Sequence, residues 1–147
     1  MGGSLEWRRE LVDNGIDALV TSNGLGIGAG GSVAIQEKLG GVAGRFTSMH
    51  NFWIELLVEG GGGFFSFFLL WYGSIIINLF KITKWNRNKK LSYYASSLLL
   101  SMIGFIPAAI AASSTIYFFP MWIMFGMAIA VINLCRKNLL LPNGTQY

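Results

Sequence analysis

His50 is the only histidine of the 147-residue chain, and Asn51 follows it in the segment "GRFTSMHNFWIELLVEGGGG", residues 44–63. An imidazole titrates near neutral pH, so it can accept or donate a proton in a reaction, or donate a hydrogen bond to an anion. A single histidine can also be a surface or structural residue. The residue type therefore leaves a catalytic and a structural interpretation open.

Three arginines, Arg8, Arg9 and Arg45, precede His50 in the sequence. A guanidinium binds phosphate oxygens through two parallel hydrogen bonds, so two or three of them beside an imidazole would suit an anionic ligand. Each arginine could instead contact lipid headgroups or solvent. These four side chains are the candidates for chemistry.

The sequence lacks the residue patterns that a metal site, a serine hydrolase or an internal disulfide would need. A metal site is not predicted, because the chain has no second histidine, no cysteine near His50 and no HExxH spacing. A serine hydrolase is not predicted either, since Ser48 is too close to His50 in sequence and no G-x-S-x-G motif occurs. The single cysteine, Cys135, cannot form an internal disulfide.

A glycine series, "GLGIGAGGS", occupies residues 24–32. A nucleotide-binding loop would need a preceding buried strand and, in a P-loop, a lysine, and neither is present. We expect a tight turn packed at a membrane surface. An alternative is a loop whose backbone N–H groups approach an anion closely.

Composition places these residues beside a membrane. Hydrophobic residues make up 53% of the chain and charged residues 12%, which excludes disorder and an ordinary soluble domain. All seven acids lie before residue 60, whereas the later part contains seven cations and no acid. A basic balance can indicate nucleic acid, but these cations flank long apolar runs. We therefore predict a lipid bilayer and no nucleic acid as partner.

Three uncharged runs predict transmembrane helices, at residues 64–80, 91–112 and 116–135. The first would be about 26 Å long as a helix, near the lower limit for a span. Pro107 should kink the second, and Pro120 lies near the start of the third, where a proline fits. Several aromatic residues suit membrane interfaces or helix packing: Trp71, Tyr72, Tyr93, Tyr94, Tyr117 and Trp122.

The cations predict the orientation. Residues 81–90 contain five cations and no acid, and Arg136 and Lys137 follow the third run. By the positive-inside rule, both groups are cytoplasmic. We thus expect a multi-pass protein of the plasma membrane with residues 1–63 on the outer face, three spans over 64–135 and a cytoplasmic tail over 136–147.

The outer segment should be helical with glycine-rich turns. Residues 4–21 have an amphipathic pattern, with Ser4 as N-cap and a stop signal at Asn23 and Gly24. A short helix is predicted over residues 33–39. The apolar face expected for the first helix comprises Leu5, Val12, Ile16, Leu19 and Val20.

A further amphipathic helix is predicted over residues 49–58, meeting the membrane at a shallow depth. Its apolar face would comprise Phe52, Trp53, Leu56 and Leu57, with Glu55 and Glu59 pointing away. Residues 60–63 are four glycines, which favour a kink or break before the first span. The expected fold is an all-α integral membrane protein with three transmembrane helices and an N-terminal outer-face segment, a partial GT-C-like glycosyltransferase fold by the resemblance described next.

Taken together, "GLGIGAGG", an arginine-containing spacer, "HNFWIELLVEGG" and the apolar run after it resemble the C-terminal part of the O-antigen ligase and polymerase superfamily. The segment "HNFWIELL", residues 50–57, is most similar to teichuronic-acid-type polysaccharide polymerases. The family pattern is a Gly-x-Gly-x-Gly turn, a His-Asn pair, a glutamate on the following helix and a glycine beyond it. Here these are His50-Asn51, Glu55 and Gly61, and the resemblance covers roughly residues 4–135.

The resemblance implies a membrane glycosyltransferase that moves glycan from undecaprenyl diphosphate to a sugar hydroxyl of an acceptor glycan, without a metal or nucleotide cofactor. By position, His50 and Arg45 would be catalytic, with His50 acting as general base or as a contact of the diphosphate. The substrate-binding positions implied are Arg8 or Arg9, Asn51, Glu55, Gly26 and Gly28.

The chain departs from the family in two respects. Family members are much longer, with further spans on the N-terminal side, and four consecutive glycines replace a more usual glycine followed by aliphatic residues. We therefore expect a C-terminal fragment that works with a separate N-terminal half or other polysaccharide-synthesis proteins. The alternative is a non-enzymatic three-span accessory protein that binds a partner through small residues such as "AAIAASS".

Overall fold

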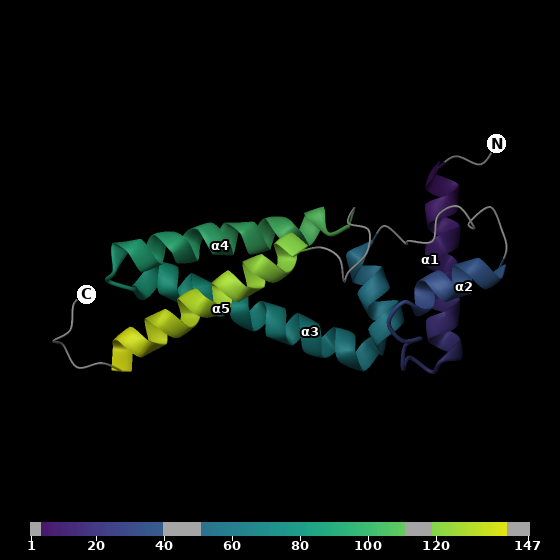
Figure 1. Cartoon of the computed structure of the whole chain (residues 1–147), viewed down its shortest axis with the longest axis horizontal. Coiled ribbons are helices and arrows are strands. Elements are labelled where there is room, and N and C mark those ends of the chain that lie inside the picture. Colours follow the sequence, from purple (N-terminus) through teal and green to yellow (C-terminus); the bar gives the residue numbers. More distant parts are fainter. Residues whose placement is uncertain (1–3, 40–50, 111–118, 141–147) are drawn as a thin grey trace. The chain divides into compact units, whose positions relative to one another are not determined.

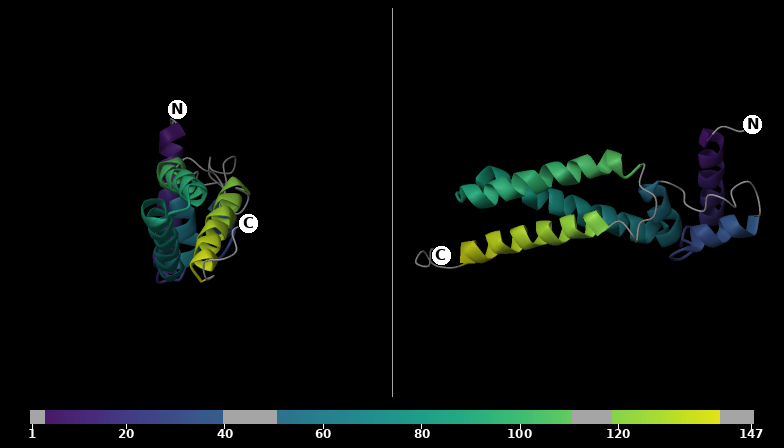
Figure 2. Two further views of the ribbon diagram at one scale, coloured as in Figure 1. Left: turned by 90° about the vertical axis from the view of Figure 1, so that its left-hand side faces the viewer. Right: turned by 45° about the horizontal axis from the view of Figure 1, so that its top comes forward.

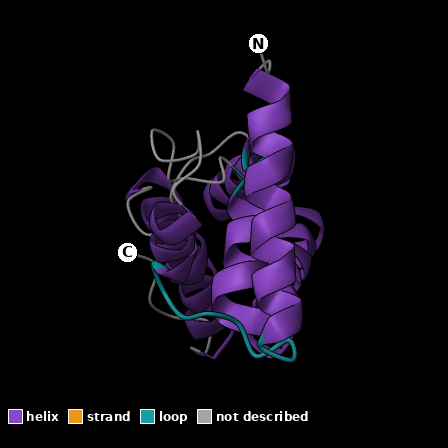
Figure 3. Cartoon of the chain, turned by 90° about the vertical axis from the view of Figure 1, so that its right-hand side faces the viewer, coloured by secondary structure: helices purple, strands orange, loops and turns teal. Residues whose placement is uncertain are grey.

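The computed structural model describes residues 4–39, 51–110 and 119–140, and every regular element in these ranges is a helix (Figures 1 and 3). This confirms the predicted all-α class. In chain order the helices are α1 (Ser4–Thr21), α2 (Gly31–Leu39), α3 (Phe52–Trp85), α4 (Lys89–Ala108) and α5 (Phe119–Leu140).

Three of these helices are long and apolar enough to cross a membrane, as the sequence predicted: α3, α4 and residues Phe119–Lys137 of α5. α3 is 34 residues long but is interrupted at Gly61, whose φ of 77° and ψ of 170° are not helical. The part after Gly61 is about 36 Å long at ~1.5 Å per residue, which is sufficient for a bilayer core of ~30 Å. The predicted break among the four glycines is confirmed.

α4 ends earlier than expected. The second span was predicted to continue to residue 112 with a kink at Pro107, but the helix ends at Ala108 and the Ile110 N–H donates to the Pro107 carbonyl at 3.2 Å. Proline has no N–H and crowds the carbonyl four residues earlier. The helix therefore ends one residue after this proline, and the kink at Pro107 stays a prediction.

The chain forms two compact units. The first comprises residues 1–69 and 107–117, and the second comprises residues 70–106 and 118–147. These are packing units; the predicted division at residues 63 and 64 concerns the sides of the membrane and stays a prediction. The predicted site residues that the structure describes, Arg9, Gly26, Gly28, Asn51 and Glu55, belong to the first unit.

In the second unit, the segments of α3, α4 and α5 lie side by side (Figure 2). The Tyr72 hydroxyl donates to the Met102 carbonyl at 2.6 Å, and the ring centroid of Phe125 lies 5.0 Å from Trp71 and 5.8 Å from Tyr72. Tyr72 therefore packs between helices, which is one of the two roles that the sequence left open for it. The buried residues of this core include Ile75, Leu79, Leu98, Met121 and Ala128.

Candidate functional site

α1 forms over the predicted residues and ends at the predicted signal. Asn23 adopts a φ of 54°, its N–H donates to the Val20 carbonyl at 3.0 Å, and the Gly24 N–H donates to the Leu19 carbonyl at 2.9 Å. These two bonds constitute a Schellman motif, in which a left-handed residue reverses the chain and satisfies the last carbonyls. The motif directs the glycine series away from the helix axis.

The buried face of α1 differs from the predicted face. Leu11 is 2% exposed and Gly15 is buried, whereas Ile16 and Val20 are 43% and 68% exposed. The prediction followed the longer row of apolar side chains, whereas the buried row continues from Leu11 only to Gly15, which has no side chain to mark it. α1 contacts α2 within this unit.

The glycine series is bonded to the interruption of α3. In a continuous helix, the Val58 and Glu59 carbonyls would accept from the N–H groups four residues later. Here the Val58 carbonyl accepts from the Ile27 N–H at 3.0 Å and the Glu59 carbonyl from the Gly28 N–H at 3.0 Å. The Gly62 N–H in turn donates to the Gly24 carbonyl at 2.9 Å. The loop therefore replaces the hydrogen bonds that the break removes.

We call this contact, of residues 24–28 with residues 58–62, the glycine seat. A Cβ atom on Gly26 would lie 2.5 Å from the Glu59 carbonyl oxygen and 2.5 Å from the Gly61 nitrogen. A Cβ atom on Gly61 would lie 2.7 Å from the Gly24 carbonyl oxygen and would also overlap the Leu25 carbonyl group. Both residues have positive φ, so backbone conformation and close approach each require glycine.

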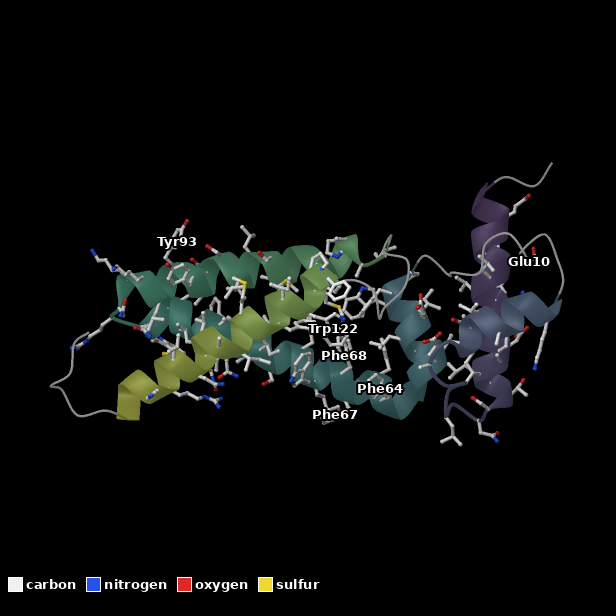
Figure 4. All side chains as sticks on the ribbon, in the orientation of Figure 1. Glu10, Phe64, Phe67, Phe68, Tyr93 and Trp122 are labelled. Carbon is white, nitrogen blue, oxygen red and sulfur yellow. The ribbon has the colours of Figure 1, made fainter. Side chains whose placement is uncertain are left out.

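The seat also explains the shape of α3. Phe52 and Phe68 would be about 24 Å apart along a straight helix, but their ring centroids are 6.0 Å apart, and Trp53 lies 6.3 Å from Phe68. The turns before Gly61 therefore fold back against the turns after it, as Figure 1 shows. Figure 4 shows Phe64 and Phe67 projecting from this bend, where they are 52% and 68% exposed.

Glu59 is the residue that sequence reasoning missed. Its carboxylate oxygen Oε1 accepts from the Ser32 hydroxyl at 2.5 Å, and Ser32 is 2% exposed. Ser32 lies in the first turn of α2, where a nearby negative charge is favourable. Glu59 thus connects α3 to the loop through its carbonyl and to α2 through its side chain. No spacing in the sequence indicated this pairing, because 27 residues separate the partners.

Asn51 caps α3. Its side-chain oxygen accepts from the N–H groups of Trp53 at 3.1 Å and Ile54 at 3.3 Å, the usual arrangement at a helix N-terminus. The Phe52 N–H donates to the Ala109 carbonyl at 3.0 Å, which joins the start of α3 to the residues after α4 within the first unit. The position immediately after His50 in the sequence is therefore well defined.

Glu55 points inward, which corrects the predicted orientation of this helix. Glu55 is 8% exposed and shares a buried face with Phe52 and Val58, whereas Leu56 and Leu57 are half-buried. The sequence pattern treated glutamate as a solvent-facing residue. The inner face is instead the one covered by the rest of the unit, so the acid lies inside.

The remaining candidates differ in what the structure describes. The Arg9 side chain is 85% exposed and its Nε lies 4.0 Å from an Asp13 carboxylate oxygen, an exposed contact of small energetic value. Arg8 belongs to α1, but its side chain is outside the described part, and Arg45 and His50 lie outside the described residues. Gly26 and Gly28 lie in the glycine seat, with their N–H groups donating to Ser22 Oγ at 3.2 Å and to the Glu59 carbonyl.

The seat favours the tight-turn interpretation of the glycine series over an anion-binding loop, because these N–H groups are used within the protein. Substrate contact by Gly26 and Gly28 stays a prediction. Within residues 4–39, 51–110 and 119–140, no three His, Cys, Asp or Glu side chains are grouped in a way that could hold a metal ion. The absence of a metal from the reaction is likewise a prediction.

The protein is an all-helical membrane protein with three apolar helices. In its first unit, Asn51 caps α3 and the glycine seat holds the break in that helix. Over 136 residues the chain is 24% identical to the teichuronic acid biosynthesis protein TuaE of Bacillus subtilis (strain 168). The similarity covers 92% of this chain and 28% of that protein, so the chain spans little more than a quarter of its relative. No family model and no solved structure matches the chain.

Proposed function

We propose that the chain is the site-bearing C-terminal part of a membrane glycosyltransferase of the O-antigen ligase and polysaccharide polymerase type. The proposal rests on the similarity to a teichuronic acid biosynthesis protein, which extends over 92% of the chain and includes both the glycine series and the His50 segment. The reaction would transfer glycan from undecaprenyl diphosphate to an acceptor sugar hydroxyl in cell-surface polysaccharide synthesis.

The proposed topology has residues 1–63 outside and residues 81–90 and the C-terminus in the cytoplasm. Two hydrogen bonds, one in each unit, support the pairing of helix ends that this topology requires, and the orientation itself rests on the positive-inside rule. Phe52 bonds to Ala109, so the start of α3 meets the end of α4, both predicted to be outside. Asn86 bonds to Cys135 at 2.9 Å, so the two basic segments meet at one end of the second unit.

In the proposed reaction, the acceptor hydroxyl oxygen attacks the anomeric carbon of the donor. The bond from that carbon to the diphosphate oxygen breaks, and the lipid diphosphate leaves with the electron pair. His50 would accept the hydroxyl proton as general base; in its other proposed role it would donate a hydrogen bond to the diphosphate, and the hydroxyl proton would pass to an oxygen of the leaving diphosphate. Arg45, with Arg8 or Arg9, would stabilise the charge that develops on the leaving group.

Asn51 and Glu55 would contribute differently. The Asn51 side-chain oxygen is used as the helix cap, so its NH2 group is the part that would donate to a substrate oxygen. Glu55 lies one helical turn after Asn51, and because its carboxylate is buried it would act by positioning the start of α3 for the substrate rather than by touching a sugar. Gly26 and Gly28 would act indirectly, by holding residues 24–28 against residues 58–62 of α3.

The test is glycan extension in cells that also contain the segments corresponding to the rest of the relative, whether continuous with this chain or separate. His50→Ala and Arg45→Ala should each reduce extension at least about 100-fold. Lys38→Ala, which removes an exposed cation from α2, is the matched control and should leave extension unchanged. Normal glycan length in His50→Ala, with normal protein in the membrane, would exclude the catalytic role.

The alternative is a three-span accessory protein without catalytic activity, which would bind a partner through small residues of its apolar helices. In that case His50, Arg45, Arg8 and Arg9 would be individually dispensable, and glycan synthesis would depend instead on the presence of the whole chain. Deletion of the chain compared with the four single substitutions distinguishes the two functions.

A further inference from the structure

Two basic segments meet at one end of the second unit, and we call this surface the basic end (residues 81–90 and 135–137). The Asn86 side-chain nitrogen donates to the Cys135 sulfur at 2.9 Å, and Cys135 immediately precedes Arg136 and Lys137. The Ser92 hydroxyl donates to the Thr83 carbonyl at 2.9 Å, which ties the start of α4 to the end of α3. Cations about 50 positions apart in sequence therefore share one surface.

The connector between α3 and α4 has a defined structure. The Asn86 side-chain oxygen accepts from the Asn88 N–H at 2.8 Å, and the Asn88 side-chain oxygen accepts from the N–H groups of Lys90 at 3.0 Å and Leu91 at 3.3 Å. The second arrangement is an N-cap of α4. Arg87 lies between the two asparagines, so its backbone and those of its neighbours are held in place.

The basic end carries seven positive charges, and no acidic side chain of the second unit balances them. Every acidic side chain of the sequence precedes residue 60, so the second unit contains none. All seven cations of the basic end are exposed: Lys81, Lys84, Arg87, Lys89, Lys90, Arg136 and Lys137. A surface of this kind attracts anions over roughly a Debye length of ~8 Å at physiological ionic strength.

Aromatic residues indicate which anion. Trp85, Tyr93 and Tyr94 are 66%, 69% and 55% exposed, and the Lys84 ammonium lies 5.9 Å from the centroid of the Trp85 ring. Figure 4 shows Tyr93 projecting away from α4. Exposed tryptophan and tyrosine at the end of an apolar helix are typical of the headgroup level of a bilayer. These rings therefore favour a lipid headgroup as the anion that the cations of the basic end would meet.

We propose that the basic end is a binding surface for anionic phospholipid headgroups of the cytoplasmic leaflet. Hydrogen bonds hold the backbone of the connector in place and join the two basic segments. Several cations can therefore contact neighbouring headgroups at the same time. The proposal goes beyond glycan transfer and rests only on the topology given above. A soluble polyanion fits less well, because the exposed rings of Trp85, Tyr93 and Tyr94, in or beside the basic end, favour the membrane–water interface.

The test uses the purified full chain in neutral detergent, with binding of phosphatidylglycerol or phosphatidylcholine measured by native mass spectrometry. Each cation near an anionic membrane contributes a factor of about five to binding, so Arg136→Gln with Lys137→Gln should weaken phosphatidylglycerol binding at least about tenfold. The control, Lys38→Gln, removes an exposed cation from the first unit and should have no effect. Phosphatidylcholine binding should be weaker than phosphatidylglycerol binding and equal in all three proteins.

Three results would overturn the proposal: equal binding of the two lipids, an equal loss in the control, or displacement of the lipid by inorganic phosphate at millimolar concentration. If the double variant lost helicity by circular dichroism, binding by the unchanged chain at 50 and 500 mM NaCl would decide instead, since headgroup contacts weaken with salt. Glycan extension is measured separately, so failure of lipid binding would leave the proposed transfer reaction unaffected.

Discussion

Two glycines of the first unit differ in their surroundings from the helical glycines of the second unit. In the first unit, Gly26 and Gly61 lie against backbone atoms, and a Cβ atom on either would overlap them. In the second unit, Gly73, Gly104 and Gly126 have no atom within 4 Å of the position a Cβ would take. The first unit is thus held by close backbone contact and hydrogen bonds, whereas the second is held by side chains that fill the space between its helices.

The largest expected effect is Gly26→Ala. The new Cβ would overlap the Glu59 carbonyl and the Gly61 nitrogen, and alanine would be strained at a φ of 86°. We expect the first unit to lose about 3 kcal/mol of stability, from the backbone strain and the overlap together. Protease resistance of residues 4–69 in detergent measures the loss.

Gly126→Ala is the matched substitution in the second unit. It should be neutral or slightly stabilising, because alanine is favoured over glycine within a helix by up to ~1 kcal/mol. Equal sensitivity of the two variants to protease would show that the two units do not differ in the way described here.

An intermediate effect is expected at the Ser32–Glu59 pair. Ser32→Ala removes the donor of a hydrogen bond to a carboxylate, which should cost about 1.5 kcal/mol. In a double-mutant cycle with Glu59→Ala, the two costs should be non-additive by a similar amount. Thermal unfolding of the four proteins measures the coupling. Simple additivity would mean that the bond contributes nothing to holding α2 on α3.

The smallest effect is expected for Tyr72→Phe in the second unit. The hydroxyl donates to the Met102 carbonyl, but hydrogen bonds between membrane helices contribute on average only about 0.6 kcal/mol. Most of the packing of Tyr72 comes from its ring, which phenylalanine keeps. A loss above ~2 kcal/mol, measured by unfolding in mixed micelles, would mean that polar contacts hold the second unit as they do the first.

The parts of the fold that local rules determine could be predicted from the sequence. The bounds of α1, its stop at Asn23 and Gly24, the break among the four glycines and the three apolar spans each depend on neighbouring residues. The second span was predicted to continue to residue 112, whereas α4 ends at Ala108, one residue after Pro107.

The parts that depend on distant partners could not be predicted. The spacing of the glycine series showed that its backbone is unrestricted, but not that it replaces the hydrogen bonds lost in α3. Glu55 and Glu59 carry charge, so the pattern assigned them to solvent, although one is buried and the other accepts from Ser32. His50 and Arg45 stay predictions from the residue pattern and the resemblance.

The glycine seat also constrains how the sequence can diverge. Every amino acid other than glycine carries a Cβ, so neither Gly26 nor Gly61 has a substitute that keeps the contact. A change at one position cannot be compensated by a change at the other, because each glycine faces backbone rather than a side chain. We expect descendants of this sequence either to retain both glycines or to have lost the pair together with the hydrogen bonds that join residues 24–28 to α3.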